Sequence, residues 1–380
     1  MSETTDTHRP EQPLRGIRVI EIGHSVAAPF CGQVLADLGA EVTKVENPNG
    51  GDDARQWGPP FIGDTAATFH SLNRNKTTIA IDLKDAAERA RLEALIAESD
   101  IVVHNMRPGL MERFDLGADA LCTNYPKLIY CNLGAYGDTG PLSRQTGYDP
   151  LMQAFSGIMS VTGEAGRPPV RVGPSIIDQG SGMWCVIGIL SALLGRAISG
   201  RGCKVDTSLF ETGLSWMTVP IANAMASGKL PGKSGSETPM LAPYRAFLAK
   251  DRHIVIAAGN NNLFRRLCET LGRPEWAEDE RFINNSNRIA NREVLNNSIG
   301  EVVAQQDADH WIVALEKVGV PCAAVNTVPE VLAHPQTKAL GMLLDSGDEK
   351  LGLVGTPLRF NGRRPALRST AKCCCPKRSP

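Results

Sequence analysis

The sequence predicts an α/β protein whose large domain is built on a mainly parallel sheet. Strand and helix patterns alternate through the first third of the chain, which is typical of βαβ units and of a sheet covered on both faces. The length of 380 residues exceeds what one hydrophobic core usually serves, so we expect two domains. A segment rich in Gly, Ser, Lys and Pro, residues 227–239, has the composition of a linker between them.

In the large domain, periodicity predicts five strands, at residues 16–22, 41–45, 78–81, 101–104 and 128–131. Helices are expected at residues 27–38 and 85–97, and Gly39 is a natural end for the first of them. The middle of the chain predicts two long apolar helices, at residues 180–198 and 209–226.

Beyond the linker, residues 244–249 and 253–257 flank a polar turn and predict a hairpin. Helices are expected at residues 262–271 and 310–318. We therefore assign residues 1–226 to the N-terminal part of the large domain, and residues 227–325 to the linker and a smaller α+β domain. Residues 326–380 are expected to return to the large domain and end in a tail.

The composition excludes several classes of protein. With 42% hydrophobic and 21% charged residues, the chain is typical of soluble globular proteins. A formal net charge of −1 gives no general attraction to nucleic acid or to an anionic membrane. The N-terminal stretch is polar, and the longest apolar run, residues 183–195, suits a buried helix and is too short for a membrane span. We expect a cytoplasmic protein with neither nucleic-acid nor membrane partners.

The ten cysteines do not indicate a metal or redox centre. Seven are dispersed singly, without the paired spacing of zinc or redox sites. Cys373, Cys374 and Cys375 adjoin in a basic tail, where a reduced, frayed terminus is favoured over a metal site. Three histidines also lack metal-ligand spacing and are expected to be structural: His24, His70 and His104.

The first strand-to-helix turn, residues 23–29, lacks the G-x-G-x-x-G dinucleotide fingerprint. Its small residues would let a ligand approach a helix N-terminus, and tight packing explains them equally well. Basic residues follow the predicted strands, where open α/β sheets bind ligands. A phosphate-rich ligand and ordinary solvated surface both fit these four positions: Lys76, Lys84, Arg107 and Arg113.

Asp178 follows an apolar pair and directly precedes the predicted helix that starts at Gly180. Gly180 and Gly182 would expose backbone N–H groups and leave room for a bulky group. Asp178 can therefore lie beside a bound group or act as a simple helix cap, and the pattern alone favours the cap.

Eight further segments occur in an order that is specific although each is weak alone: PLRGIRVIEIG (13–23), ADLGAEVTKVE (36–46), NRNKTTIAIDLK (73–84), DIVVHNMRPG (100–109), GYDPLMQAFSG (147–157), RVGPSIIDQGSG (171–182), GRGCKVDTSLFE (200–211) and GVPCAAVNT (319–327). Over about residues 14–365 the chain resembles the family III CoA-transferases, which include formyl-CoA:oxalate and carnitine CoA-transferases and the related α-methylacyl-CoA racemases. The resemblance implies a Rossmann-like large domain, a smaller α+β domain and an interlocked homodimer.

The resemblance also implies the site. It places the nucleophile at Asp178, with coenzyme A or acyl-CoA as substrate and no prosthetic group or metal. It implies CoA contacts at Val26, Ala27, Asn47, Ile81, Asp82, Leu83, Lys84, Asn105, Met106, Arg107, Arg113, Arg144 and Tyr148. Asn47 departs from the family pattern, because many relatives carry Arg there.

The activity implied is transfer of coenzyme A from an acyl-CoA donor to a carboxylic acid through an aspartyl-CoA thioester, with small dicarboxylates as the acceptors that family habits suggest. The alternative is an acyl-CoA racemase or isomerase on the same fold. Those enzymes carry a histidine thirty residues before the aspartate, where this chain has Tyr148. A phenol is a poor base for α-proton exchange at neutral pH, so transfer is favoured. A non-catalytic CoA-binding protein is a third interpretation.

Overall fold

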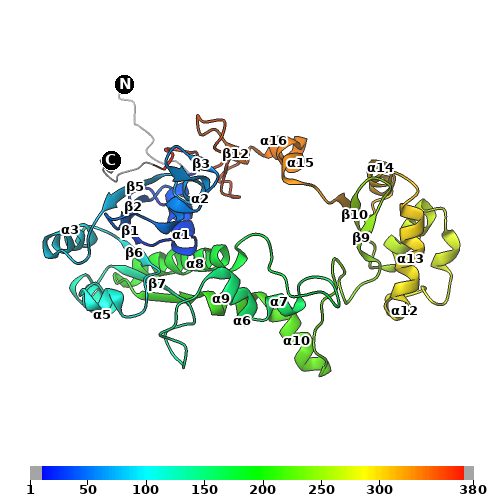
Figure 1. Cartoon of the computed structure of the whole chain (residues 1–380), viewed down its shortest axis with the longest axis horizontal. Helices are drawn as coiled ribbons and strands as arrows, with labels where there is room; N and C mark the ends of the chain where they lie inside the picture. Colours follow the sequence, from blue (N-terminus) through cyan, green and yellow to red (C-terminus); the bar gives the residue numbers. More distant parts are fainter. Residues whose placement is uncertain (1–10, 372–380) are drawn as a thin grey trace. The chain divides into compact units, whose positions relative to one another are not determined.

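The computed structural model describes residues 11–371, which form two compact units (Figure 1). The first unit is made of residues up to 158, residues 171–228 and residues from 335 onward; the second is made of residues 159–170 and 229–334. The second unit therefore takes in residues 159–170, a segment that the sequence analysis placed in the large domain. Cys373, Cys374 and Cys375 lie outside the described residues.

The first unit is built on a six-stranded parallel sheet of order β5-β2-β1-β6-β7-β8 (Figure 1). Its strands are β1 (Arg18–Ile22), β2 (Glu41–Glu46), β5 (Lys76–Ala80), β6 (Ile101–His104), β7 (Ile129–Gly134) and β8 (Lys204–Ser208). Counted along the chain, this order is 3-2-1-4-5-6, and it reverses between β1 and β6, where doubly wound sheets open a ligand crevice. The predicted parallel sheet is present, and β8 was missed because its sequence KVDTS is polar.

Helices pack on both faces of this sheet. α1 and α8 pack against each other and cover one face, while α3 and α5 bury Leu92, Ile96 and Leu121 against Ile20 and Tyr130. The helices of this unit are α1 (Ala27–Asp37), α2 (Ala67–Leu72), α3 (Ala86–Ala97), α4 (Leu110–Arg113), α5 (Ala118–Asn124), α6 (Asp149–Phe155), α8 (Ile176–Ser199), α9 (Leu209–Trp216), α10 (Thr218–Ser227) and α16 (Pro335–Leu340), with a 3-10 helix at Asp53–Gln56.

Two predictions about the middle of the chain were wrong. The predicted helix over residues 209–226 is two helices, α9 and α10, which meet at Met217. The other helix, α8, begins at Ile176 instead of Gly180, so Asp178 lies inside its first turn. The glycines serve packing: a Cβ on Gly180 would lie 2.8 Å from the Trp216 ring, and one on Gly182 would lie 2.7 Å from the Ala27 carbonyl oxygen.

The predicted buried helix is also only partly buried. Met183, Trp184, Ile187, Leu194 and Ile198 of α8 are exposed. At 24 residues, α8 is longer than the apolar run suggested, and its length and composition alone would allow it to cross a bilayer. Its buried side packs on α1 and on strands β7 and β8.

The first unit also holds short antiparallel pairs, and its last part comes from the C-terminal segment. The pairs are β3 (Phe61–Ile62) with β4 (Thr65–Ala66) and β12 (Leu343–Leu344) with β13 (Leu353–Val354). Residues 356–369 return to α1 and its neighbours: Thr356 donates to the Asp37 carboxylate, and Arg368 donates to the Ala36 and Ala40 carbonyls.

The second unit has a three-stranded antiparallel sheet of order β11-β10-β9, and the predicted hairpin is its β9–β10 pair. Its core gathers buried side chains such as Phe264, Ile299 and Trp311. The elements are β9 (Tyr244–Leu248), β10 (His253–Ala257), β11 (Cys322–Ala324), α11 (Asn261–Thr270), α12 (Asn285–Ala290), α13 (Arg292–Val303), α14 (Ala308–Lys317) and α15 (Val328–Ala333), with a 3-10 helix at Pro274–Ala277; α7 (Ile158–Val161) lies at the boundary of the two units.

Candidate active site

Two adjoining cavities lie at the carboxyl ends of the six parallel strands. The first, which we call the Lys84 cavity, has a volume of about 350 Å³ and is lined by Ile22, Gly23, His24, Val45, Glu46, Asn47, Gly51, Asp52, Asp53, Ile81, Asp82, Leu83, Lys84, Met106, Leu110, Arg113 and Phe114. The second, the Asp178 cavity, has about 230 Å³ and is lined by His24, Ser25, Val26, Ala27, Asp53, Trp57, Asn105, Met106, Arg107, Pro108, Leu133, Gly134, Ala135, Gln145, Thr146, Gly147, Tyr148, Asp178 and Leu209. His24, Asp53 and Met106 line both, so the two cavities lie side by side along the crevice.

The structure brings most of the sequence-predicted site residues to this edge. Those that line the Lys84 cavity are Asn47, Ile81, Asp82, Leu83, Lys84 and Arg113. Those that line the Asp178 cavity are Val26, Ala27, Asn105, Arg107, Tyr148 and Asp178, and Met106 lines both.

Two basic residues lie elsewhere. Arg144 lines neither cavity; it is exposed, with its guanidinium beside Gly109. Lys76, considered above for a phosphate rim, opens β5 and is buried, and its ammonium lies 2.8 Å from the Glu21 carboxylate. The surface interpretation of Lys76 and its phosphate alternative are therefore both wrong.

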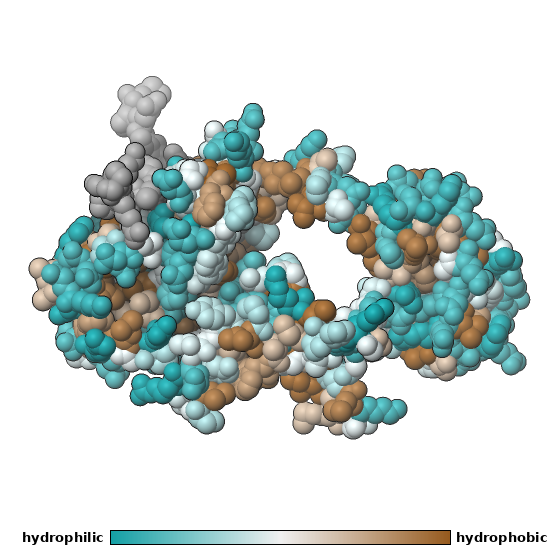
Figure 2. Space-filling model, in the orientation of Figure 1, coloured by the Kyte–Doolittle hydropathy of each residue, from teal (hydrophilic) through white to brown (hydrophobic). Residues whose placement is uncertain are grey.

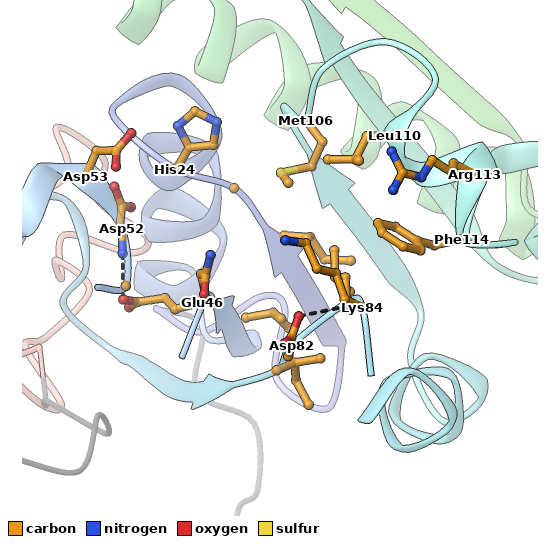
Figure 3. Close-up of a pocket in the computed structure, with 17 residues that line it drawn as sticks. His24, Glu46, Asp52, Asp53, Asp82, Lys84, Met106, Leu110, Arg113 and Phe114 are labelled. Carbon is orange, nitrogen blue, oxygen red and sulfur yellow. Dashed lines mark hydrogen bonds between the residues drawn. The ribbon is translucent and has the colours of Figure 1, made fainter. Parts of the chain in front are cut away.

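Charge is distributed unevenly around the Lys84 cavity. Figure 3 shows Lys84 and Arg113 near Phe114, while Glu46, Asp52 and Asp53 lie on the opposite side. Asp82 is the acidic residue beside Lys84, and its carboxylate accepts a hydrogen bond from the Lys84 backbone N–H at 2.9 Å. The carboxylate of Glu46 accepts two hydrogen bonds from Arg55, at 2.7 and 2.8 Å, so its charge is compensated. Both Lys84 and Arg113 are exposed at the rim. An anionic group could therefore meet two cations here, and charge-assisted contacts of that kind are strong.

The turn between β1 and α1 forms the boundary between the cavities and is held tightly. Ser25 adopts a left-handed conformation, with φ of 69°, which is uncommon for a residue with a side chain. Its N–H donates to Asp52 Oδ1 at 2.8 Å. Asn105, from the loop after β6, accepts from the His24 N–H at 3.0 Å and donates to the His24 carbonyl at 2.9 Å. Asn105 therefore joins the two strands on either side of the crevice.

A buried ionic cluster supports this turn from below. Lys44 Nζ lies 2.9 Å from both the Glu21 and Asp52 carboxylates and donates to the Gly23 carbonyl at 2.7 Å. All three side chains are fully buried. Burial raises the pKa of Asp52, but Lys44 and the Ser25 N–H outweigh it, so the pKa lies below its usual value. The compensated charges make this cluster a scaffold.

Asp178 is held on a different local structure. The helix α8 has Ser175 at its N-cap, and that side chain makes no capping hydrogen bond. Instead, Asp149 Oδ2 accepts from the N–H groups of Ile177, at 2.8 Å, and Asp178, at 3.2 Å. The cap of this helix therefore comes from Asp149 of α6, and the interpretation of Asp178 as the cap is wrong.

The chemistry of Asp178 follows from its surroundings. Burial, and next the charge of Asp149, raise the pKa of Asp178 to about 7. A carboxylate that is partly buried in a cavity, with a raised pKa, is a more basic nucleophile than a solvated one and still ionises near neutral pH. The side chain can attack an electrophilic carbonyl brought into the cavity.

The histidines considered in the sequence analysis take up separate positions. Burial and the charge of Lys204 lower the pKa of His104 to about 4, so this histidine is neutral and part of the core. The Nδ1 of His24 lies 3.1 Å from its neighbour, the Ser25 hydroxyl. In the part of the chain that the structure describes, no three metal-binding side chains cluster.

The sequence analysis missed four residues that shape this site: Lys44, Asp52, Asp53 and Asp149. Asp149 carried one usable signal, because Asp followed by Pro150 often marks a helix start. Its partner, however, lies 28 residues farther along the chain, and no local pattern could have named it.

Comparison with known proteins gives a consistent result. Residues 14–371 match the family described as CoA-transferase family III. The chain is 38% identical to an acetyl-CoA:oxalate CoA-transferase of Acetobacter aceti, over 95% of this chain and 92% of that one. It is 35% identical to a succinate–glutarate CoA-transferase of Agrobacterium fabrum, over 96% and 95%. Among solved structures, it resembles a CAIB/BAIF family protein from Brucella suis with a TM-score of 0.87 and 39% identity, over 96% and 97%.

Proposed function

The chain belongs to CoA-transferase family III and is a CoA-transferase, and we propose that it works through an aspartyl-CoA thioester on Asp178. The observation that carries this proposal is the Asp178 carboxylate itself, which lines a cavity at the sheet crevice and has its pKa raised to about 7. Relatives are named for oxalate, glutarate and mesaconate, so a small dicarboxylate is the acceptor class that we assign.

Coenzyme A would lie along both cavities. The phosphates suit Lys84 and Arg113 of the Lys84 cavity, and the turn at Val26 and Ala27 leads from there toward Asp178. Arg107, exposed in the Asp178 cavity, can neutralise a further anionic group. This placement matches the rule that doubly wound sheets bind ligands where their strand order reverses.

The reaction then runs in balanced steps. An Asp178 oxygen attacks the thioester carbonyl, the C–S bond breaks, and the CoA thiolate leaves with the electron pair. The thiolate attacks the Asp178 carbonyl of the mixed anhydride, which gives aspartyl-CoA and releases the donor carboxylate. The acceptor carboxylate reverses both steps. Holding thiolate and anhydride together supplies an effective molarity on the order of 10⁵ M or more, which outruns hydrolysis.

We also infer that two copies of the chain assemble, interlocked as the family resemblance implies, in the cytoplasm. The support is the set of exposed apolar side chains on α8, α9 and α10: Met183, Trp184, Ile187, Leu194, Ile198, Leu214, Trp216, Val219, Ile221 and Met225. Figure 2 shows hydrophobic residues at the surface where α10 lies. An apolar surface on this scale marks an interaction site. Sedimentation at nanomolar concentration should give a dimer, and a stable folded monomer would contradict the assembly.

The decisive experiment traps the intermediate. Wild-type protein incubated with an acyl-CoA donor and no acceptor should gain the mass of CoA on the peptide that contains Asp178, and hydroxylamine should convert that residue to a hydroxamate. Asp178→Ala should lose transfer while it still binds CoA. Asp53 is the other carboxylate that lines the same cavity, so label on Asp53, or an active Asp178→Ala protein, would overturn the proposal.

A further inference from the structure

Asp149 lies directly beneath the proposed nucleophile without lining either cavity. It is the first residue of α6, and only 2% of it is exposed. Its carboxylate accepts three hydrogen bonds: Gln153 Nε2 to Oδ1 at 2.6 Å, and the N–H groups of Ile177 and Asp178 to Oδ2. Burying a carboxylate this deeply costs free energy of folding. We therefore expect its position next to Asp178 to have a function.

Gln153 extends the hold of Asp149 to the chain before α8. Its Oε1 accepts from the Val172 N–H at 2.8 Å, while its amide donates to Asp149. Asp149 and Gln153 of α6 thus hold the segment that leads into α8 at two points, one before Ser175 and one after it. The backbone of Asp178 is therefore positioned by α6 and not by its own helix cap.

We propose that Asp149 is a positioning residue for CoA transfer: its carboxylate fixes the backbone of Asp178, and its negative charge disfavours the ionised nucleophile relative to the acylated one. This inference rests on the proposed function. During acylation the negative charge leaves Asp178, because the C–S bond breaks with its electron pair on sulfur and the new C–O bond makes Asp178 neutral. The repulsion between the two carboxylates is present before attack and absent afterwards.

Other charged groups do not offer the same contact. The ionisable groups that share the Asp178 cavity are His24, Asp53, Arg107 and Tyr148. The elements packed on α8 carry few charges, and those are engaged elsewhere: Asp37 of α1 with Arg74, Lys204 of β8 with Asp206, and Glu211 of α9 with Ser208. Asp149 is the carboxylate that bonds the backbone of Asp178 itself, and its charge contributes to the raised pKa of that residue.

Two variants separate positioning from charge. Asp149→Ala removes both, and we expect kcat to fall by roughly 10–100-fold with little change in KM for acyl-CoA, because Asp149 touches neither cavity. The double variant Asp149→Asn with Gln153→Glu restores the same hydrogen bonds, but the bond between positions 149 and 153 runs in the opposite direction, from 149 to 153. The introduced amide oxygen accepts from the N–H groups of Ile177 and Asp178, and the introduced carboxylate at position 153 accepts from that amide and from the Val172 N–H. This variant should recover most of kcat.

The pH profile reports the charge. In both variants the acidic limb of kcat/KM should move down by roughly 0.5–1 pH unit, because Asp178 ionises more easily once the neighbouring charge is removed or displaced. The matched control is Asn284→Ala, which removes the cap of α12, a hydrogen bond of 2.9 Å to the Asn287 N–H, and should leave the limb unchanged.

An unmoved limb in both variants, or a loss confined to KM, would overturn the proposal. Folding is checked by thermal unfolding, and the double variant keeps the test valid if Asp149→Ala does not fold. An inactive Asp178→Ala protein together with an unmoved limb would reject the role of Asp149 alone, whereas an active Asp178→Ala protein would reject the proposed function.

Discussion

Two groups of carboxylates lie at the same crevice and have opposite electrostatics. Beneath the β1–α1 turn, Glu21 and Asp52 surround Lys44, and attraction to the lysine lowers the pKa of Asp52 despite burial. At the start of α8, Asp149 and Asp178 are both acidic, and burial together with repulsion raises the pKa of Asp178 to about 7.

The difference separates support from reactivity. A compensated carboxylate stays ionised and holds backbone, as Asp52 holds the N–H of Ser25. A carboxylate without a compensating cation becomes more basic, and the protein is stabilised when that charge is removed. Both properties suit a nucleophile. The comparison therefore predicts that changes in the first group damage stability, whereas changes in the second damage the reaction.

The largest expected effect is on stability, from Lys44→Met. It leaves the buried Asp52 carboxylate without an ammonium partner and leaves Glu21 with Lys76 alone, which should lower the free energy of unfolding by about 3–5 kcal/mol. Lys204→Met is the matched control, because Lys204 is paired with Asp206 at 3.0 Å but is 42% exposed, and its loss should cost less than about 1 kcal/mol. Urea unfolding of both proteins measures the difference, and equal losses would show that the buried cluster is not special.

The next effect is the pH dependence of the wild-type enzyme. Asp178 must be ionised to attack, and its pKa is about 7. We expect kcat/KM to fall about tenfold per pH unit below that value. Initial rates with an acyl-CoA donor across a pH range of about 5 to 9 test this. An acidic limb near pH ~4 would mean that Asp178 has an ordinary carboxylate environment.

A smaller effect concerns the stability of Asp178→Ala. A raised folded-state pKa means that the native protein binds more protons than the unfolded chain, so the ionised side chain lowers stability as pH rises from about 4 to about 7. At a pH of about 8 the Ala variant should be more stable than wild type by about 1–2 kcal/mol, and near pH ~4 this gain should vanish. Thermal unfolding at the two pH values measures it, and a pH-independent difference would contradict the uncompensated charge.

The smallest effect is expected from Tyr148→His. Tyr148 lines the Asp178 cavity and is 54% exposed. An imidazole at this position would add a base, but it would not have a buried carboxylate beside it, as Asp178 has in Asp149. Exchange also requires a substrate α-carbon held between the two groups. A 2-methylacyl-CoA in D₂O should gain no deuterium with this variant, and rapid incorporation would show a site already arranged for racemisation.

The sequence alone determined the parallel sheet, the hairpin of the second unit and the candidate nucleophile. Buried strands such as β1 and β6 are short apolar runs between helical patterns, so local periodicity is enough to find them. The segment around Asp178, taken with the others in order, identified the family, and most of the residues predicted from it line the two cavities. These are signals that lie within a few consecutive residues.

Only the tertiary structure decided how Asp178 is held and what its ionisation is. The sequence pattern made Asp178 a helix cap, but the cap is Asp149, which is far along the chain and reaches α8 because α6 packs on it. Likewise, the sequence gives no sign that three separate polar residues form one cluster, because only the folded sheet buries Lys44, Glu21 and Asp52 together. Hydrogen bonds between distant residues and the loss of water around a charge depend on packing, and a local pattern carries no record of either.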